Sequence, residues 1–139
     1  MTRRRARELV MQMLYEGDFH GEEDRERILY NTISGMTDKE KSSNKSIIKY
    51  IEETYFGIYS NMQEIDEKIG AVADNWSVSR MAKVDLSILR VAIYELNYTE
   101  VPVKVVVNEA VEIAKEFSTE KSPRFIHGVL GKVTELKEV

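Results

Sequence analysis

Four arginines stand close together near the start of the chain, and their chemistry suits phosphate. Arg3, Arg4, Arg5 and Arg7 fall within five positions. A guanidinium group donates paired hydrogen bonds to phosphate oxygens and stacks on bases. A helix behind these residues would hold them in place and add the positive end of its dipole. The pattern predicts an RNA or DNA phosphate contact; the alternative is a frayed, solvated N-terminus.

A second group with similar chemistry lies near the end of the chain, in the stretch "EKSPRF". Lys121 and Arg124 flank an expected helix start, and Phe125 follows directly. Free backbone amides at a helix start favour phosphate, and an exposed aromatic ring can stack on an unpaired base. Phe125 is a single-strand contact only if it faces the same side as the cations. If it faces inward, it is a core residue.

The charge distribution sets the arginine group apart from the rest of the chain. The net charge is −4, yet residues 1–10 carry four arginines against Glu8, a sum of +3, which leaves −7 for the remainder. A local basic patch on an acidic body favours a specific polyanion contact over general adhesion to polyanions. This asymmetry is therefore a candidate for function.

Catalytic chemistry has little support in the residue types. The chain has no cysteine, which excludes disulfides, thiolate catalysis and cysteine-based zinc sites. His20 and His127 are far apart in sequence, and no glycine-rich phosphate loop or paired-histidine metal motif occurs. We therefore expect no enzyme activity, no cofactor and no metal. Neither a signal-peptide core nor a membrane span is expected, which indicates a cytoplasmic protein.

The cations must be positioned by helices, because the apolar pattern is helical along nearly the whole chain. Arg3 and Arg7 should share one face of the first helix, with Arg4 beside them. The first helix should fade near Gly17–Gly21. Its apolar positions recur at three- and four-residue spacing and are Ala6, Leu9, Val10, Met13 and Leu14.

Six further helices are expected, which makes the protein all-α with about seven helices. Val84–Tyr98 is apolar nearly all round and should be the buried central helix. The stretch "GMTDKEKSSN" is predicted to be a polar connection. Trp76 and the six methionines are expected in or near the core. The expected helices after the first are Glu23–Ser34, Ser46–Tyr59, Met62–Asp74, Val84–Tyr98, 101–117 and a last helix from Ser122.

Two of these helices depend on proline and glycine positions. The valine run at 103–107 has strand propensity, but Pro102 suits a first helical turn, so a helix is favoured. In the last helix Ser122 is the expected N-cap and Pro123 the first helical residue. Gly128 and Gly131 lower the stability of that helix, which predicts a neighbouring helix packed very close to them.

Three segments together resemble a known family. "RRRARELVMQMLY", "WSVSRMAKVDLSILRVAIYEL" and "NEAVEIAKEFSTEKSPRFIHGVLGKV" occur in the order and at the separations typical of the NusB family of bacterial transcription antitermination factors. The resemblance spans nearly the whole chain and is strongest from Trp76 to Lys132. It implies one domain over residues 1–139, with two small helical bundles, about 1–75 and about 76–139, sharing a long central helix.

The resemblance also implies a function and its residues. Members bind boxA, a single-stranded RNA element of ribosomal RNA transcripts, together with ribosomal protein S-ten (NusE), within an RNA polymerase antitermination complex. RNA contact is implied for Arg3, Arg4, Arg5, Arg7, Lys121, Arg124 and Phe125. The implied partner surface includes Tyr15 and Asp85, where an acidic group would suit a basic ribosomal protein. The sequence leaves open whether the free protein is a monomer or a homodimer.

Some positions depart from the family pattern. Pro123 stands where glycine or histidine is common, His127 where asparagine is common, and Lys121 where the residue is often acidic or polar. Ser118 and Gly131 replace a frequent glycine and aspartate. These changes leave the fine RNA preference and the role of His127 open.

Two other functions compete with the RNA-binding interpretation. One is a helical protein–protein adaptor without RNA binding. The other is an RNA-modifying enzyme, since domains like this one occur fused to RNA methyltransferases. The chain contains no glycine-rich motif for a methyl donor, so we expect a methyl-transfer assay to be blank.

Overall fold

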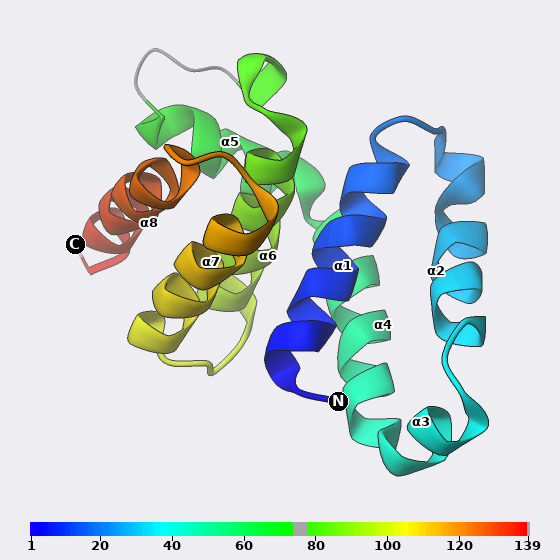
Figure 1. Ribbon diagram of the computed structural model, residues 1–139. Helices are drawn as coiled ribbons and strands as arrows, with labels where there is room; N and C mark the ends of the chain where they lie inside the picture. Colours follow the sequence, from blue (N-terminus) through cyan, green and yellow to red (C-terminus); the bar gives the residue numbers. More distant parts are fainter. Residues whose placement is uncertain (74–77, 139) are drawn as a thin grey trace.

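The computed structural model describes residues 1–73 and 78–138, and this part of the chain is all-α, as predicted (Figure 1). Short 3-10 turns occur at Glu22–Asp24 (η1) and Val78–Arg80 (η2). The described α-helices are α1 (Arg3–Gly17), α2 (Arg25–Ser34), α3 (Asp38–Ser43), α4 (Lys45–Ser60), α5 (Met62–Val72), α6 (Lys83–Tyr98), α7 (Val103–Phe117) and α8 (Ser122–Glu138).

Helix α6 forms the centre of the molecule. It packs against α1 and α4 on one side and against α5, α7 and α8 on the other (Figure 1). Every residue from Asp85 to Ile93 is buried. The hydrophobic effect explains this position, because a helix that is apolar nearly all round can cover itself only by lying between other helices. The predicted all-α arrangement around a central helix is therefore confirmed, but α5, which was predicted to belong to the first bundle, packs mainly against α6 and α8.

A buried arginine ties the two bundles together at α6. Arg90 donates from Nε and Nη2 to the two carboxylate oxygens of Asp66 in α5, each at 2.9 Å. Its Nη1 donates to Asp18 Oδ1, at the end of α1, at 3.1 Å. Burial opposes the charge of Arg90, but its hydrogen bonds to these carboxylates and their negative charge outweigh burial and raise the pKa of Arg90. Three elements distant in sequence thus meet at one guanidinium group.

The segment predicted as a polar connection contains a short helix, α3, so that prediction is wrong in part. Thr37 Oγ1 accepts a hydrogen bond from Glu40 N at 3.1 Å, and the Glu40 carboxylate accepts one from Thr37 N at 3.3 Å. This reciprocal capping box satisfies two backbone donors that a helix start otherwise leaves free. The signature T-x-x-E was present in the sequence, but the segment lacks an apolar stripe.

The prediction that a helix packs closely on Gly128 and Gly131 is wrong. A Cβ atom placed on either residue would have no heavy atom within 4 Å. Close approach occurs at Gly57 instead, where a Cβ would overlap the hydroxyl of Tyr94, and at Gly17, where it would overlap that of Tyr59. The two α8 glycines lie away from neighbouring elements, which a helical pattern alone does not reveal.

The remaining predictions differ from the structure in small ways. Pro102 directly precedes α7 and Ser122 is the first residue of α8, which are differences within the usual scatter of helix ends. The prediction that all six methionines lie in or near the core is wrong for Met1, which is exposed. Trp76 and the predicted boundary at 75/76 lie outside the described residues. Among the described helices, none has the length and apolar character that crossing a bilayer requires.

Candidate nucleic-acid interface

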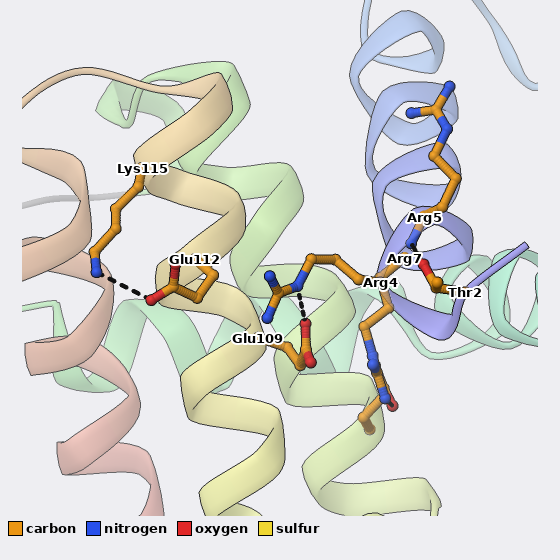
Figure 2. A network of polar contacts seen from close by, with 8 residues as sticks. Thr2, Arg4, Arg5, Arg7, Glu109, Glu112 and Lys115 are labelled. Atoms are coloured by element: carbon orange, nitrogen blue, oxygen red, sulfur yellow. Dashed lines mark hydrogen bonds and ion pairs between the residues drawn. The ribbon is translucent and has the colours of Figure 1, made fainter.

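Helix α1 presents its arginines in several directions. Thr2 caps the helix, since its Oγ1 accepts a hydrogen bond from Arg5 N at 3.0 Å. Figure 2 shows Arg4, Arg5 and Arg7 leaving the helix along three different paths. Helical geometry requires this, because neighbouring residues are rotated by about 100° around the axis. The four arginines therefore do not form one phosphate cradle.

Two of the arginines, Arg3 and Arg5, face solvent. The guanidinium carbon of Arg3 lies 4.4 Å from the centre of the Tyr50 ring, and that of Arg7 lies 5.9 Å from it, which confirms that Arg3 and Arg7 share a face of the helix. Arg5 Nη1 lies 3.1 Å from Glu8 Oε1. The Arg5 side chain is 47% exposed in this pair, although that of Glu8 is only 10% exposed. Arg3 and Arg5 thus remain accessible to a phosphate.

Arg4 is held by a carboxylate of α7. Its Nε lies 2.6 Å from Glu109 Oε2, with the Arg4 side chain 42% exposed and that of Glu109 19% exposed (Figure 2). The hydrogen bond that Arg4 donates to Glu109 raises the pKa of Arg4. Glu112 lies close enough to add a smaller effect, although it also pairs with Lys115 at 3.0 Å. A phosphate that reaches Arg4 must share or replace Glu109.

Arg7 is buried, although the resemblance implied a direct RNA contact for it. Only 6% of the residue is exposed. Its Nε and Nη2 donate to the two carboxylate oxygens of Glu95 in α6 at 2.6 and 3.0 Å. Burial and the Glu95 carboxylate raise the pKa of Tyr50, whose hydroxyl also donates to Glu95, at 3.0 Å. Arg7 thus joins α1, α4 and α6, and has little surface left for a phosphate.

The second cationic group lies at the start of α8. Lys121 and Arg124 are exposed and, within the described part of the chain, neither forms an ion pair. Phe125 is half-buried and packs partly against the core. Its ring combines the two alternatives raised by the sequence, because one part contacts the core and another remains accessible. The structure thus leaves two free cations beside a partly open aromatic ring.

A surface pocket of about 550 Å³ opens beside these residues. It lies between the start of α6 and the start of α8, and η2 adds Arg80 to its wall. Met81 and Phe125 provide apolar surface, and Asp85 and Lys121 provide opposite charges. Pockets with mostly apolar walls and a few fixed polar groups are typical of ligand sites.

The first cationic group contacts α7 within the helix, whereas the start of α8 contacts the residue that directly follows α7. Arg4 reaches Glu109, whereas the α8 start is bonded to Ser118, nine positions further along. At about 1.5 Å per helical residue, these anchor points are separated by about 14 Å. That distance corresponds to about four phosphates of a stacked strand, at about 3.4 Å each. The structure does not join the groups into one site, but a short strand could span both.

Of the two residues predicted for partner binding, Tyr15 lies near the C-terminal end of α1 and Asp85 lies in the first turn of α6. Tyr15 is 39% exposed and forms an edge-to-face pair with Phe19, which is 61% exposed, with ring centres 5.2 Å apart. Asp85 is buried and accepts a hydrogen bond from Ser118 Oγ at 2.5 Å. Tyr15 therefore presents an accessible aromatic surface, whereas Asp85 is buried and lines the pocket.

Sequence reasoning missed the partners that decide which arginines are free. Tyr50, Glu95 and Glu109 read as ordinary helix positions, because ion pairs across helices carry no local signal. A carboxylate inside an otherwise apolar helix, as Glu95 is, was the one available clue. Among the described residues, no group of three potential metal ligands occurs. His20 Nδ1 lies 3.5 Å from Asp24, and His127 is exposed.

Comparisons with known proteins agree over nearly the full length. A family model described as the NusB family matches residues 4–135. The transcription antitermination protein NusB of Thermoanaerobacter sp. (strain X514) is 44% identical over 131 residues, which cover 94% of this chain and 89% of that protein. The protein of the same name from Clostridium botulinum (strain Loch Maree / Type A3) is 43% identical over 141 residues, covering 96% and 99%.

Solved structures show the same fold. T. maritima NusB aligns with a TM-score of 0.80 at 34% identity, covering 97% of this chain and 92% of that chain. A complex described as antitermination factors NusB and NusE with double-stranded RNA aligns through one chain, with a TM-score of 0.80 at 24% identity, covering 98% and 99%. At that lower identity the second match supports the fold alone.

Proposed function

The chain belongs to the NusB family of non-enzymatic transcription antitermination factors, and from this premise we propose that it binds single-stranded boxA RNA of ribosomal RNA transcripts. The observation that carries the proposal is the start of α8. There Lys121 and Arg124 have no ion-pair partner among the described residues, and both precede the half-buried Phe125 within one helical turn. Cations with an adjacent aromatic platform suit an unpaired strand, whose bases are free to stack.

The arginines of α1 extend this interface. We propose that Arg3 and Arg5 contact phosphates directly and that Arg4 does so in competition with Glu109. Arg7 acts indirectly, since its pair with Glu95 holds the first turns of α1 against α6 and so positions the other arginines. The strand would then pass α7 on its way from α1 to α8. Affinity should be largely electrostatic and should fall as salt rises.

The protein partner proposed for this chain is ribosomal protein S-ten (NusE). The solved complex described above pairs NusB with NusE and RNA. In this chain Tyr15 and Phe19 form an exposed aromatic pair, which suits an interface because such rings bury much area at little entropic cost. The charge of −7 outside residues 1–10 would attract a basic partner. Asp85 would take part only if the partner reached into the pocket.

The pair is proposed to act within an RNA polymerase antitermination complex in the cytoplasm. A free homodimer that covers the RNA face is the other state to be measured, and sedimentation at several concentrations would detect it. The rival function is a helical adaptor that binds protein alone. It predicts S-ten capture with no RNA affinity.

The test is an anisotropy titration of the full chain with a boxA RNA of about twelve nucleotides and with a scrambled RNA of the same composition, each with and without S-ten. We expect boxA to bind more tightly and S-ten to strengthen its binding. Phe125→Ala should weaken RNA binding and lower the melting temperature only modestly, because part of the ring is exposed. Equal binding of both RNAs would remove the boxA preference from the proposal, and S-ten capture without any RNA binding would leave the adaptor as the better explanation.

A further inference from the structure

A buried carboxylate faces the pocket between α6 and the start of α8. Asp85 is 8% exposed and lines this pocket of about 550 Å³. Its Oδ1 accepts a hydrogen bond from Ser118 Oγ at 2.5 Å, whereas Oδ2 bonds to no described residue. No fully buried side-chain oxygen in the described chain lacks a partner, so Oδ2 is open to the pocket. The pocket therefore offers a strong acceptor to a ligand that carries hydrogen-bond donors.

A cluster of hydroxyl groups holds this carboxylate in place. Ser118 Oγ lies 2.8 Å from Ser122 Oγ, which lies 2.8 Å from Thr119 Oγ1. Thr119 N also donates to Ser122 Oγ, at 3.2 Å. The cluster connects the end of α7 with the start of α8 and fixes the donor that orients Asp85. An acceptor fixed before binding costs little entropy when a ligand arrives.

The other pocket residues suit the remaining parts of a nucleotide. Met81 and Phe125 supply apolar surface on which a flat base can lie. Arg80 and Lys121 are exposed at the pocket and, among the described residues, form no ion pair. They can therefore meet a phosphate. An acceptor, an apolar platform and two cations match the base edge, the ring face and the phosphate of one nucleotide.

We propose that this pocket is a guanine subsite of the RNA interface, a refinement that rests on the function proposed above. A carboxylate only accepts hydrogen bonds. Guanine has two neighbouring donors on its Watson–Crick edge, N1–H and the N2 amino group. Adenine and cytosine place a ring acceptor beside their amino group, and uracil flanks its one donor with two carbonyls. Oδ2 is open, and Oδ1 keeps a second acceptor position beside the Ser118 bond, so guanine is the best complement.

A basic side chain of a protein partner is the competing occupant, since it too would pair with Asp85. Lys121 and Arg80 line the same pocket and would repel a second cation, whereas they would attract the phosphate of a nucleotide. Charge complementarity therefore favours the nucleotide, and the experiment includes the other occupant as an outcome.

The first test uses the unaltered full chain. Anisotropy titrations compare an oligouridine of about twelve nucleotides with the same strand carrying one central guanosine, inosine, adenosine or cytidine. We expect the guanosine strand to bind about tenfold more tightly than oligouridine. Inosine lacks the N2 amino group and should lose most of that gain. Equal affinity of the guanosine and inosine strands would overturn the proposal, whatever any variant does.

The second test uses Asp85→Asn with a matched control. The asparagine keeps an oxygen for the Ser118 hydroxyl but replaces one acceptor by a donor, so the guanosine preference should disappear. Glu120→Gln removes the same charge from an exposed neighbouring position outside the pocket wall and should raise the affinity of all strands equally. If Asp85→Asn weakens folding, Ser118→Ala, which leaves the carboxylate in place, should still reduce the preference.

Further results would count against the guanine subsite or against the proposed function. A retained guanosine preference in Asp85→Asn would show that the Asp85 carboxylate does not recognise guanine. Loss of S-ten binding in Asp85→Asn without any change in base preference would assign the pocket to the protein partner. Uniform binding of every strand would remove the subsite but keep the proposed RNA function. Absence of all RNA binding would refute the proposed function itself.

Discussion

Arginine has opposite roles in two regions of the molecule. One region, called the seam below, contains the buried ion pairs of α6, Arg7 with Glu95 and Arg90 with Asp66; the other is the start of α8. In the seam, Arg7 and Arg90 are buried and each donates two hydrogen bonds to a single carboxylate. At the start of α8, Arg124 is exposed and has no ion-pair partner among the described residues. The residue type is the same, but the seam satisfies its donors internally while the α8 start leaves them for a ligand. Burial and partners, rather than charge alone, separate structural from binding arginines.

The largest expected effect is the loss of stability when the Arg7–Glu95 pair of the seam is removed. Arg7→Ala should lower the free energy of unfolding by about 3–5 kcal/mol, because Glu95 would be left buried and without its charge partner. Chemical denaturation followed by circular dichroism measures this loss. Arg27→Ala removes an exposed arginine from α2 and should cost less than about 1 kcal/mol. An Arg7→Ala protein of normal stability that had lost RNA affinity would reverse the role assigned to this residue.

The next effect concerns the α8 start. Arg124→Ala should weaken boxA binding by about tenfold and reduce the slope of log affinity against log salt by about 0.7, the amount expected for one phosphate contact to a single strand. Stability should stay unchanged. Lys39→Ala removes the same charge from α3 and should leave the salt slope unaltered. An unchanged slope in Arg124→Ala would move the RNA interface away from α8.

A smaller effect separates the two contributions of Tyr50. Tyr50→Phe removes the hydroxyl that donates to Glu95 but keeps the ring beside Arg3. Unfolding should become easier by about 1 kcal/mol, and RNA affinity should remain within twofold. Denaturation and anisotropy on the same preparation test both statements. A loss of RNA affinity without a loss of stability would show that the hydroxyl serves the ligand.

The smallest expected effect concerns Arg4 and tests whether an exposed but paired arginine can still bind RNA. Arg4 is intermediate, because it is exposed yet paired with Glu109. Glu109→Gln should raise RNA affinity about threefold, since a phosphate would no longer compete with a carboxylate for the guanidinium group. Glu116→Gln makes the same charge change elsewhere on α7 and serves as the control. Equal increases in both variants would mean that net charge, and not the pair with Arg4, limits binding.

Most of the fold could be predicted from local sequence, and particular residues show why. The near-continuous apolar character of α6 required a central position, and the spacing of Ile51, Tyr55 and Ile58 required an inward face for α4. Helix α3 was missed because it has a capping box but no apolar stripe. The glycines of α8 were misread because close packing depends on a neighbouring helix, which local spacing does not describe.

The sequence by itself determined the helices, the buried centre and the clustering of cations near Thr2 and Ser122, because helical periodicity and capping act between residues close in the chain. Tertiary structure alone decided which cations are free. Arg7 meets Glu95 across 88 positions, Arg4 meets Glu109 across 105, and Asp85 meets Ser118 across 33. Electrostatic energy depends on distance in space and on burial, and neither quantity exists until the helices have packed.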